Sequence, residues 1–166
     1  MAGEPSDGVI KGVMNLGRLL SDIARRRPDD IGLVYGEETI TWGTLDGRVN
    51  ALVQGMKDLG LTKGDRILLA GGNTPSWVEA VWAILKLGSF VVPVNPRLSV
   101  PEMAYLCDHS GSKAIVYTAG YEEHVDAMRV EAASVAHVIA LDGPRNGEIG
   151  HTDLIDTHLG AEPWEA

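Results

Sequence analysis

The stretch from Gly64 to Leu98 constrains the fold of this chain more than any other. It contains an apolar run at 67–70, a turn of small residues at 71–74 and a second apolar run at 90–94. The intervening segment, 75–87, has the length and composition of a helix. Strand, helix and strand over this length predict a βαβ unit, whose two strands run parallel.

The predicted helix over 75–87 defines its own boundaries and indicates its surroundings. Thr74 is a suitable N-cap, and Gly88 supplies a C-terminal stop. Apolar side chains occupy most faces of the helix, and only Glu79 and Lys86 interrupt them. Because a helix that is apolar nearly all round is covered on more than one side, we expect this one in the core.

The rest of the chain continues this alternation of helices and strands. Apolar residues recur at helical spacing in four further segments, and short apolar runs bounded by turn residues occur in four others. This alternation predicts an α/β fold with a mostly parallel sheet and flanking helices. The further helices are expected at 16–27, 45–59, 101–109 and 124–133, and the further strands at 31–35, 39–42, 114–117 and 137–141.

The composition divides the chain into three parts. Residues 1–14 are rich in glycine and polar side chains, which predicts a flexible terminus. Residues 15–141 form the predicted α/β subdomain. Residues 142–166 contain several pairs with glycine and few apolar runs, which predicts a loop-rich end with a short helix at 152–158.

Charge and cysteine content exclude several classes of protein. The net charge of -9 argues against nucleic acid as a partner, because a phosphate backbone demands a basic surface. No apolar run reaches the length of a membrane span. The single Cys107 suits a reducing cytoplasm, where we predict the protein to lie. The run Arg25–Arg27 is typical of cations at a helix C-terminus; contact with acidic lipid is the alternative, which leaves peripheral association with a membrane open.

Several short motifs follow one another in the order and spacing of a known family. Together they resemble the N-terminal part of the AMP-forming adenylating superfamily, which includes acyl-CoA synthetases and luciferases. Trp42 departs from the pattern, since the family usually has tyrosine there. Residues 95–98, followed by Glu102 and Tyr105, resemble fatty-acid-CoA ligases more than peptide-synthetase domains. The motifs are 41–45, 64–67, 73–77 and 85–95.

The resemblance implies a two-step reaction in the intact enzyme. A fatty or other carboxylic acid attacks ATP to give an acyl-adenylate and pyrophosphate, and coenzyme A then takes the acyl group. The resemblance implies ATP, Mg²⁺ and coenzyme A as cofactors. The family's phosphate loop, its Thr-Glu pair, its ribose-binding aspartate and its mobile lysine have no counterpart in these 166 residues. We therefore predict no catalytic residue, cofactor site or metal site within this chain, which would end before the phosphate loop and be inactive alone.

Two residues near the start of the predicted helix are candidate substrate contacts. Asn73 and Trp77 are predicted to form part of the wall of an acyl pocket, since such pockets are mostly apolar. Ordinary packing of Trp77 in the core is the favoured alternative. Gly71 and Gly72, between strand and helix, are interpreted as a tight turn rather than a phosphate loop. Arg97 is expected to pair with a neighbouring glutamate or, less often, to meet an anion.

A second class of function stays open from the sequence. The chain is also consistent with a non-enzymatic interaction module that binds a partner through an exposed sheet edge. Self-association is expected under either hypothesis, because an incomplete parallel sheet exposes apolar surface. A small nucleotide-binding domain is a third, more general interpretation.

Overall fold

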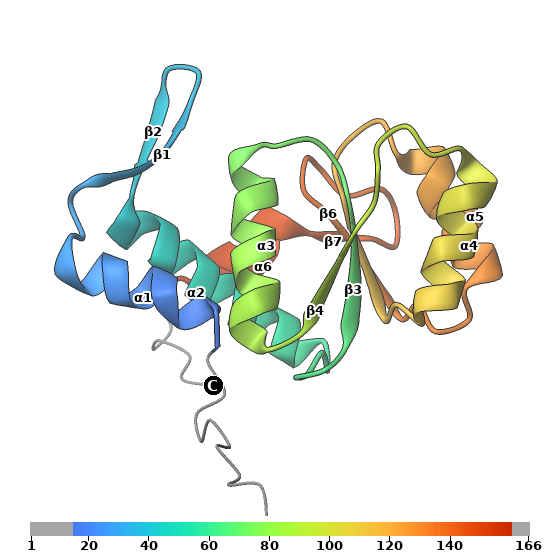
Figure 1. Cartoon of the computed structure of the whole chain (residues 1–166), viewed down its shortest axis with the longest axis horizontal. Helices are drawn as coiled ribbons and strands as arrows, with labels where there is room; N and C mark the ends of the chain where they lie inside the picture. The colour runs from blue at the N-terminus through green and yellow to red at the C-terminus, as the bar shows by residue number, and fades with distance from the viewer. Residues whose placement is uncertain (1–14, 161–166) are drawn as a thin grey trace, which may run out of the picture.

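The computed structural model describes residues 15–160, so the predicted flexible terminus and the last six residues lie outside the described part of the chain. A sheet with helices on both faces forms the body, and a two-stranded hairpin extends from one end (Figure 1). The helices are α1 (Gly17–Arg26), α2 (Trp42–Asp58), α3 (Pro75–Leu87), α4 (Val100–Ser110), α5 (Glu122–Glu131) and α6 (His151–His158). The strands are β1 (Ile31–Tyr35), β2 (Glu38–Thr41), β3 (Arg66–Ala70), β4 (Phe90–Pro93), β5 (Ala114–Tyr117), β6 (His137–Ala140) and β7 (Ile149–Gly150).

The main sheet has the strand order β4-β3-β5-β6-β7, and all its pairs are parallel. In the β3–β4 pair, Ile67 lies opposite Val91 and Leu68 opposite Val92. This confirms both the βαβ unit and the α/β class. Strands β1 and β2 form a separate antiparallel hairpin that leads directly into α2.

Alternate residues of β3 face two different halves of the core. Ile67 and Leu69 belong to a cluster built mainly with α2 and α3, to which α1 and α6 contribute Leu20 and Ile155. Leu68 belongs to a second cluster built with α4 and α5. The period of two along a strand thus divides its side chains between the two faces of the sheet.

Local sequence signals fix the ends of α2 and α3. The hydroxyl of Thr41 accepts a hydrogen bond from the amide of Thr44, and that of Thr74 accepts one from the amide of Trp77. Gly88 ends α3 at φ 79°, a left-handed conformation that glycine adopts without strain. The caps at Thr74 and Gly88 agree with the positions predicted from the sequence.

The first helix, expected at 16–27, begins at Gly17. Leu16 occupies the N-cap position, while the Asn15 side chain accepts a hydrogen bond from the Gly17 amide. The Asn15 amide group also donates to the carbonyl oxygen of Lys86, at the end of α3. A Cβ atom at position 17 would lie 2.3 Å from the Lys86 Cα, so glycine permits this close approach.

Residues 149–158 add to the sheet and to the core. Strand β7 pairs with β6, so Ile149 lies opposite Ile139. No strand was expected here, because two residues are too short to show a periodic pattern. The predicted short helix is present as α6, which packs against α2 where Leu154 approaches Gly55.

Charged contacts fix the loop between β6 and β7. The Tyr117 hydroxyl donates to Glu148 at 2.7 Å. The Arg145 guanidinium binds Glu148 and also Asp126 on α5. The pKa of Tyr117 is raised to about 12, mainly by burial and secondly by the hydrogen bond to Glu148. The loop is therefore attached both to β5 and to a helix on the opposite face of the sheet from α6.

Candidate functional site

A cavity of about 680 Å³ lies where the hairpin, the first turn of α3 and the start of α6 meet. Its walls include residues just beyond the carboxyl end of β6, the edge at which ligands bind in open α/β sheets. Most of its lining is polar and hydroxyl-rich. The lining residues are Tyr35, Glu38, Thr39, Ile40, Thr41, Thr44, Arg48, Thr74, Pro75, Ser76, Glu79, Leu141, Asp142, His151 and Thr152.

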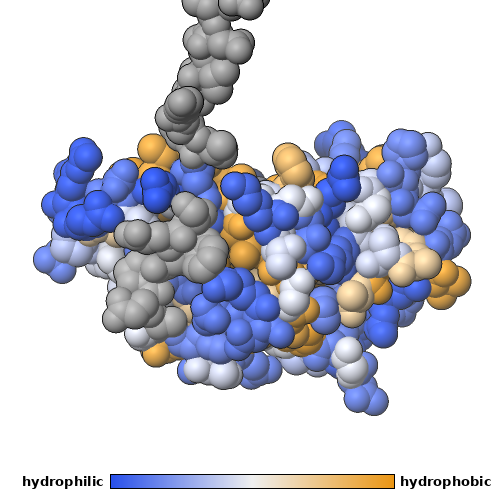
Figure 2. All heavy atoms as spheres, turned by 90° about the horizontal axis from the view of Figure 1, so that it is seen from below, coloured by the Kyte–Doolittle hydropathy of each residue, from blue (hydrophilic) through white to orange (hydrophobic). Residues whose placement is uncertain are grey.

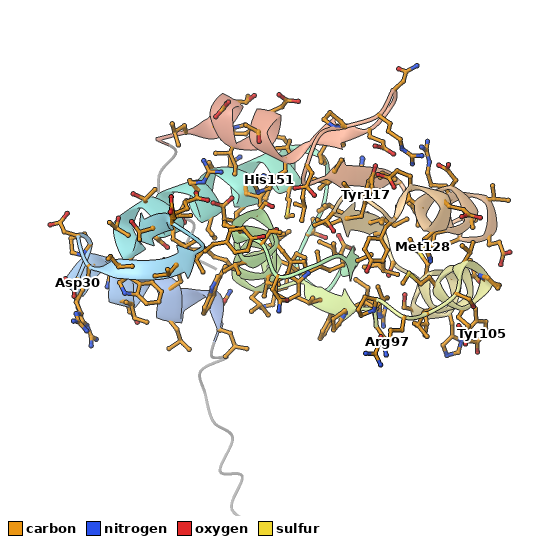
Figure 3. All side chains as sticks on the ribbon, turned by 90° about the horizontal axis from the view of Figure 1, so that it is seen from above. Asp30, Arg97, Tyr105, Tyr117, Met128 and His151 are labelled. Carbon is orange, nitrogen blue, oxygen red and sulfur yellow. The ribbon has the colours of Figure 1, made fainter. Side chains whose placement is uncertain are left out.

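Three charged or titratable side chains from three helices meet at this cavity. Arg48 of α2 donates to both carboxylate oxygens of Glu79 on α3. His151 of α6 places Nε2 3.0 Å from Glu79 Oε2, and Figure 3 shows this histidine where the three helices meet. Glu79 is 1% exposed and His151 is 2% exposed. Burial opposes ionisation of Glu79, but contacts from His151 and Arg48 outweigh it, so the pKa of the carboxyl is lowered.

A second buried polar cluster lies farther along α3. Lys86 is 2% exposed, and its Nζ atom lies 2.7 Å from Asp46 Oδ1. Lys86 also donates to the side chain of Asn50, while Ser21 of α1 donates to Asp46. The sequence suggested that Glu79 and Lys86 merely interrupt an apolar helix. Instead, each forms ionic contacts that join α3 to α2.

The two predicted substrate contacts lie outside the cavity. Asn73 is exposed on the turn between β3 and α3. Trp77 is partly buried and packs against the core, as does Trp82. Neither Asn73 nor Trp77 lines the cavity described above. The packing of Trp77 agrees with the favoured alternative, and a role for the pair in an acyl pocket stays a prediction.

The turn after β3 is packed against the neighbouring strand end. A Cβ atom at Gly71 would lie 2.6 Å from the Thr118 hydroxyl, and the Gly72 amide donates to that hydroxyl at 3.4 Å. The hydroxyl of Thr74 is engaged as a helix cap. Because these groups serve the packing of the turn, they do not fit a phosphate, and the interpretation as a tight turn is supported.

The remaining predicted contacts are partly corrected by the structure. Glu102 accepts hydrogen bonds from the amide and hydroxyl of Ser99, which forms a capping box. The expected pair with Arg97 is therefore wrong: among residues 15–160, Arg97 has no ion pair. The Ser-x-x-Glu pattern at 99–102 was the signal that could have found the cap.

The chemistry of the described residues does not fit a resident metal or a reactive thiol. Within residues 15–160 no three His, Cys, Asp or Glu side chains gather in a way that could hold a metal ion. Cys107 is buried. The pKa of its thiol is raised to about 11, mainly by this burial and secondly by the negative charge of Asp108. A thiol of this kind is inert, because the thiolate is the reactive form. In the same part of the chain, no helix is long and apolar enough to cross a bilayer.

Comparison with known proteins decides the family. The model of the AMP-binding enzymes matches residues 20–160, which include both buried polar clusters and the whole main sheet. This chain is a member of that AMP-binding enzyme family. The resemblance inferred from the order of the motifs is thereby confirmed.

Similar proteins within the AMP-binding family are acyl-CoA ligases. The mitochondrial medium-chain acyl-CoA ligase ACSF2 of Bos taurus is 36% identical over 150 residues, covering 87% of this chain and 24% of the relative. Feruloyl-CoA synthase of an Amycolatopsis species is 32% identical over 105 residues, covering 63% of this chain and 21% of the relative. The chain thus spans less than a quarter of either relative, and it corresponds to their N-terminal part.

A solved structure supports the assignment of the fold. A fatty acyl-CoA synthetase of Mycobacterium tuberculosis superposes with a TM-score of 0.78 at 27% identity, covering 90% of this chain and 29% of that protein. The superposition extends beyond the region in which the motifs were recognised. The carboxyl-terminal β7 and α6, which the sequence did not place in the sheet domain, are therefore elements of one α/β unit in this family member.

Proposed function

We propose that this AMP-binding family member provides the N-terminal scaffold of a ligase that joins a fatty acid to coenzyme A at the expense of ATP. The observation that carries the proposal is the family match over 20–160, together with relatives named as acyl-CoA ligases. In the intact enzyme, the carboxylate would be activated as an acyl-adenylate before transfer to the thiol. The enzyme is proposed to act in the cytoplasm, with its lipid substrate bringing it to the membrane surface.

The role proposed for the described residues is structural. The Arg48–Glu79–His151 and Lys86–Asp46 contacts hold α2, α3 and α6 in fixed relation to the carboxyl edge of the sheet. Such positioning contributes to catalysis because reacting groups must be held in a defined geometry. Asn73 and Trp77 are proposed as part of the acyl-pocket wall that further parts of the enzyme would complete.

We further propose that the 166-residue chain does not catalyse the reaction by itself. This rests on the absence from the sequence of a Pro-Lys-Gly phosphate loop and of the other ATP-contacting residues of the family. The chain alone should release no pyrophosphate when supplied with ATP, Mg²⁺, coenzyme A and a panel of fatty and aromatic acids. Turnover by the pure chain would contradict this part of the proposal.

A chimera tests the scaffold role separately. Replacing the corresponding N-terminal part of the Bos taurus medium-chain ligase by this chain should preserve measurable pyrophosphate release with fatty acids. The same chimera carrying Asp46→Ala and Glu79→Ala should lose most of that activity, because α3 is no longer fixed. The proposal fails if the unmodified chimera folds but is inactive with every acid in the panel.

An interaction module is the second candidate function, and one feature favours it. Strand β4 is an edge of the main sheet, and Phe90 at its start is 61% exposed. An open edge of this kind pairs readily with another strand. Sedimentation of the chain at increasing concentration tests this candidate, which predicts a concentration-dependent increase in mass.

A further inference from the structure

The outer side of α1 carries an unusual row of apolar side chains. Leu16, Leu19 and Ile23 are 50%, 45% and 37% exposed. Their spacing of three and four residues places them along one side of the helix. Leu20 and Ala24 of the same helix are buried. Single exposed apolar residues are common on proteins, whereas adjacent exposed apolar residues form a candidate contact surface.

A cation extends this row. Arg26 follows Ile23 by three residues, is exposed, and has no ion pair among residues 15–160. We refer to Leu16, Leu19, Ile23 and Arg26 as the α1 row. Arg27 follows directly at the end of the helix and pairs with the half-exposed Asp30, while Arg25 lies on a different side of the helix from the row and pairs with the half-exposed Asp22. Exposed pairs of this kind are weak, so these two guanidinium groups can exchange partners at little cost.

The local charge differs in sign from the charge of the whole chain. Residues 16–27 contain four arginines and one aspartate, Asp22, whereas the chain carries a net charge of -9. Asp29 and Asp30 follow directly after this segment. A basic segment within an acidic protein, with an apolar row along it, is the pattern of a helix that lies on an anionic lipid surface.

The place of α1 in the fold separates it from the helices on the other face of the sheet. The helix lies at the end of the molecule opposite α4 and α5 (Figure 1). The face of the molecule seen from below is mostly hydrophilic, with separate hydrophobic patches (Figure 2). From Leu16 to Arg26 the row extends about 15 Å, a length suited to lying in the plane of the headgroups.

We propose that the α1 row docks the protein onto the anionic surface of a lipid bilayer. The three apolar side chains enter the boundary between headgroups and acyl chains, and Arg26 binds a lipid phosphate. The inference rests on the proposed function, because a ligase for fatty acids meets its substrate where these acids partition, in a membrane. The proposal assigns the contact with the membrane to Leu16, Leu19, Ile23 and Arg26.

Flotation of the full chain with vesicles tests the proposal. The chain should float with vesicles of phosphatidylcholine mixed with phosphatidylglycerol, less with phosphatidylcholine alone, and less again as salt is raised. The double variant Leu19→Gln, Ile23→Gln should bind the mixed vesicles at least ~10-fold more weakly. Arg26→Gln should weaken binding about fivefold. Circular dichroism checks folding, which these exposed positions should leave intact.

Helix α5 offers a matched control. Val130 is 86% exposed and follows Arg129 at the far end of the molecule. The variant Arg129→Gln, Val130→Gln should bind the mixed vesicles like the parent chain. Equal loss in the α1 and α5 variants would overturn the proposal, as would no flotation of the folded parent chain with the mixed vesicles.

Two further measurements separate this inference from its alternatives. If the α1 row instead joined two copies, Leu19→Gln, Ile23→Gln would lower the mass in sedimentation without changing flotation, and that result would overturn the proposal. Ligase activity of the chimera with a short, water-soluble acid and no vesicles reports the proposed function alone. Activity without flotation would therefore reject the membrane contact and leave the ligase assignment standing.

Discussion

The two faces of the main sheet are stabilised by different chemistry. On the face covered by α2, α3 and α6, the core contains Glu79 and Lys86, the buried charged side chains of residues 15–160 apart from the titratable His151. On the face covered by α4 and α5, the core is apolar and includes two methionines and a cysteine. The same strands thus support a core with fixed ionic contacts on one side and an adaptable one on the other.

This difference indicates which side of the sheet tolerates change. A buried ion pair contributes little net stability, but removing one partner leaves an uncompensated charge. Methionine-rich packing accepts substitution more readily, because the side chain is flexible and unbranched. We infer that the buried ion pairs fix the position of α3, whereas α4 and α5 can shift slightly to accommodate substitutions in their core.

The largest expected effect comes from the buried lysine. Asp46→Ala removes the carboxylate bound by Lys86 and Ser21, and it should lower the free energy of unfolding by about 3–5 kcal/mol because the ammonium group stays buried. Urea denaturation measures the change. The double variant Asp46→Leu, Lys86→Met should recover most of the loss. A single-variant cost below about 1 kcal/mol would show that Lys86 reaches water easily.

A smaller effect is expected on the apolar face. Met128 of α5 is fully buried between the helix and the sheet (Figure 3). Met128→Ala should cost about 2–4 kcal/mol through lost burial and a cavity, while Met128→Leu should cost less than about 1.5 kcal/mol. The same denaturation series compares the two. If Met128→Ala and Met128→Leu lowered the free energy of unfolding equally, this face would tolerate substitution no better than the face that contains the ion pairs.

The smallest expected effect is on how the free energy of unfolding depends on pH. The pKa of Glu79 in the folded protein lies below its usual value of 4.5, so its contribution to stability is complete above that pH and is lost as the pH falls through the folded pKa. Glu79→Gln should therefore be less stable than the parent at pH 7 and differ from it less at low pH. Met128→Ala should instead follow the parent in parallel. Denaturation at a series of pH values makes the comparison, and a constant difference for Glu79→Gln would contradict it.

The fold could be predicted largely from local signals, but the site could not. Strand β3, helix α3 and the caps at Thr74 and Gly88 depend on residues close together in sequence. The partners of Glu79 lie 31 and 72 residues away, at Arg48 and His151, and no periodic pattern relates them. The two-residue strand β7 could not be predicted from the sequence pattern either, because it is defined by its pairing with β6.

The strand order also constrains how the chain can assemble during synthesis. Strand β3 is made before either of its neighbours, β4 and β5. Its four buried residues therefore emerge from the ribosome with no strand partner until about twenty further residues have followed and β4 is made, and the second partner, β5, comes about forty-five residues after β3. During this interval the buried strand β3 is accessible to chaperones, and α3, which follows it in the chain, is the first helix available to cover it.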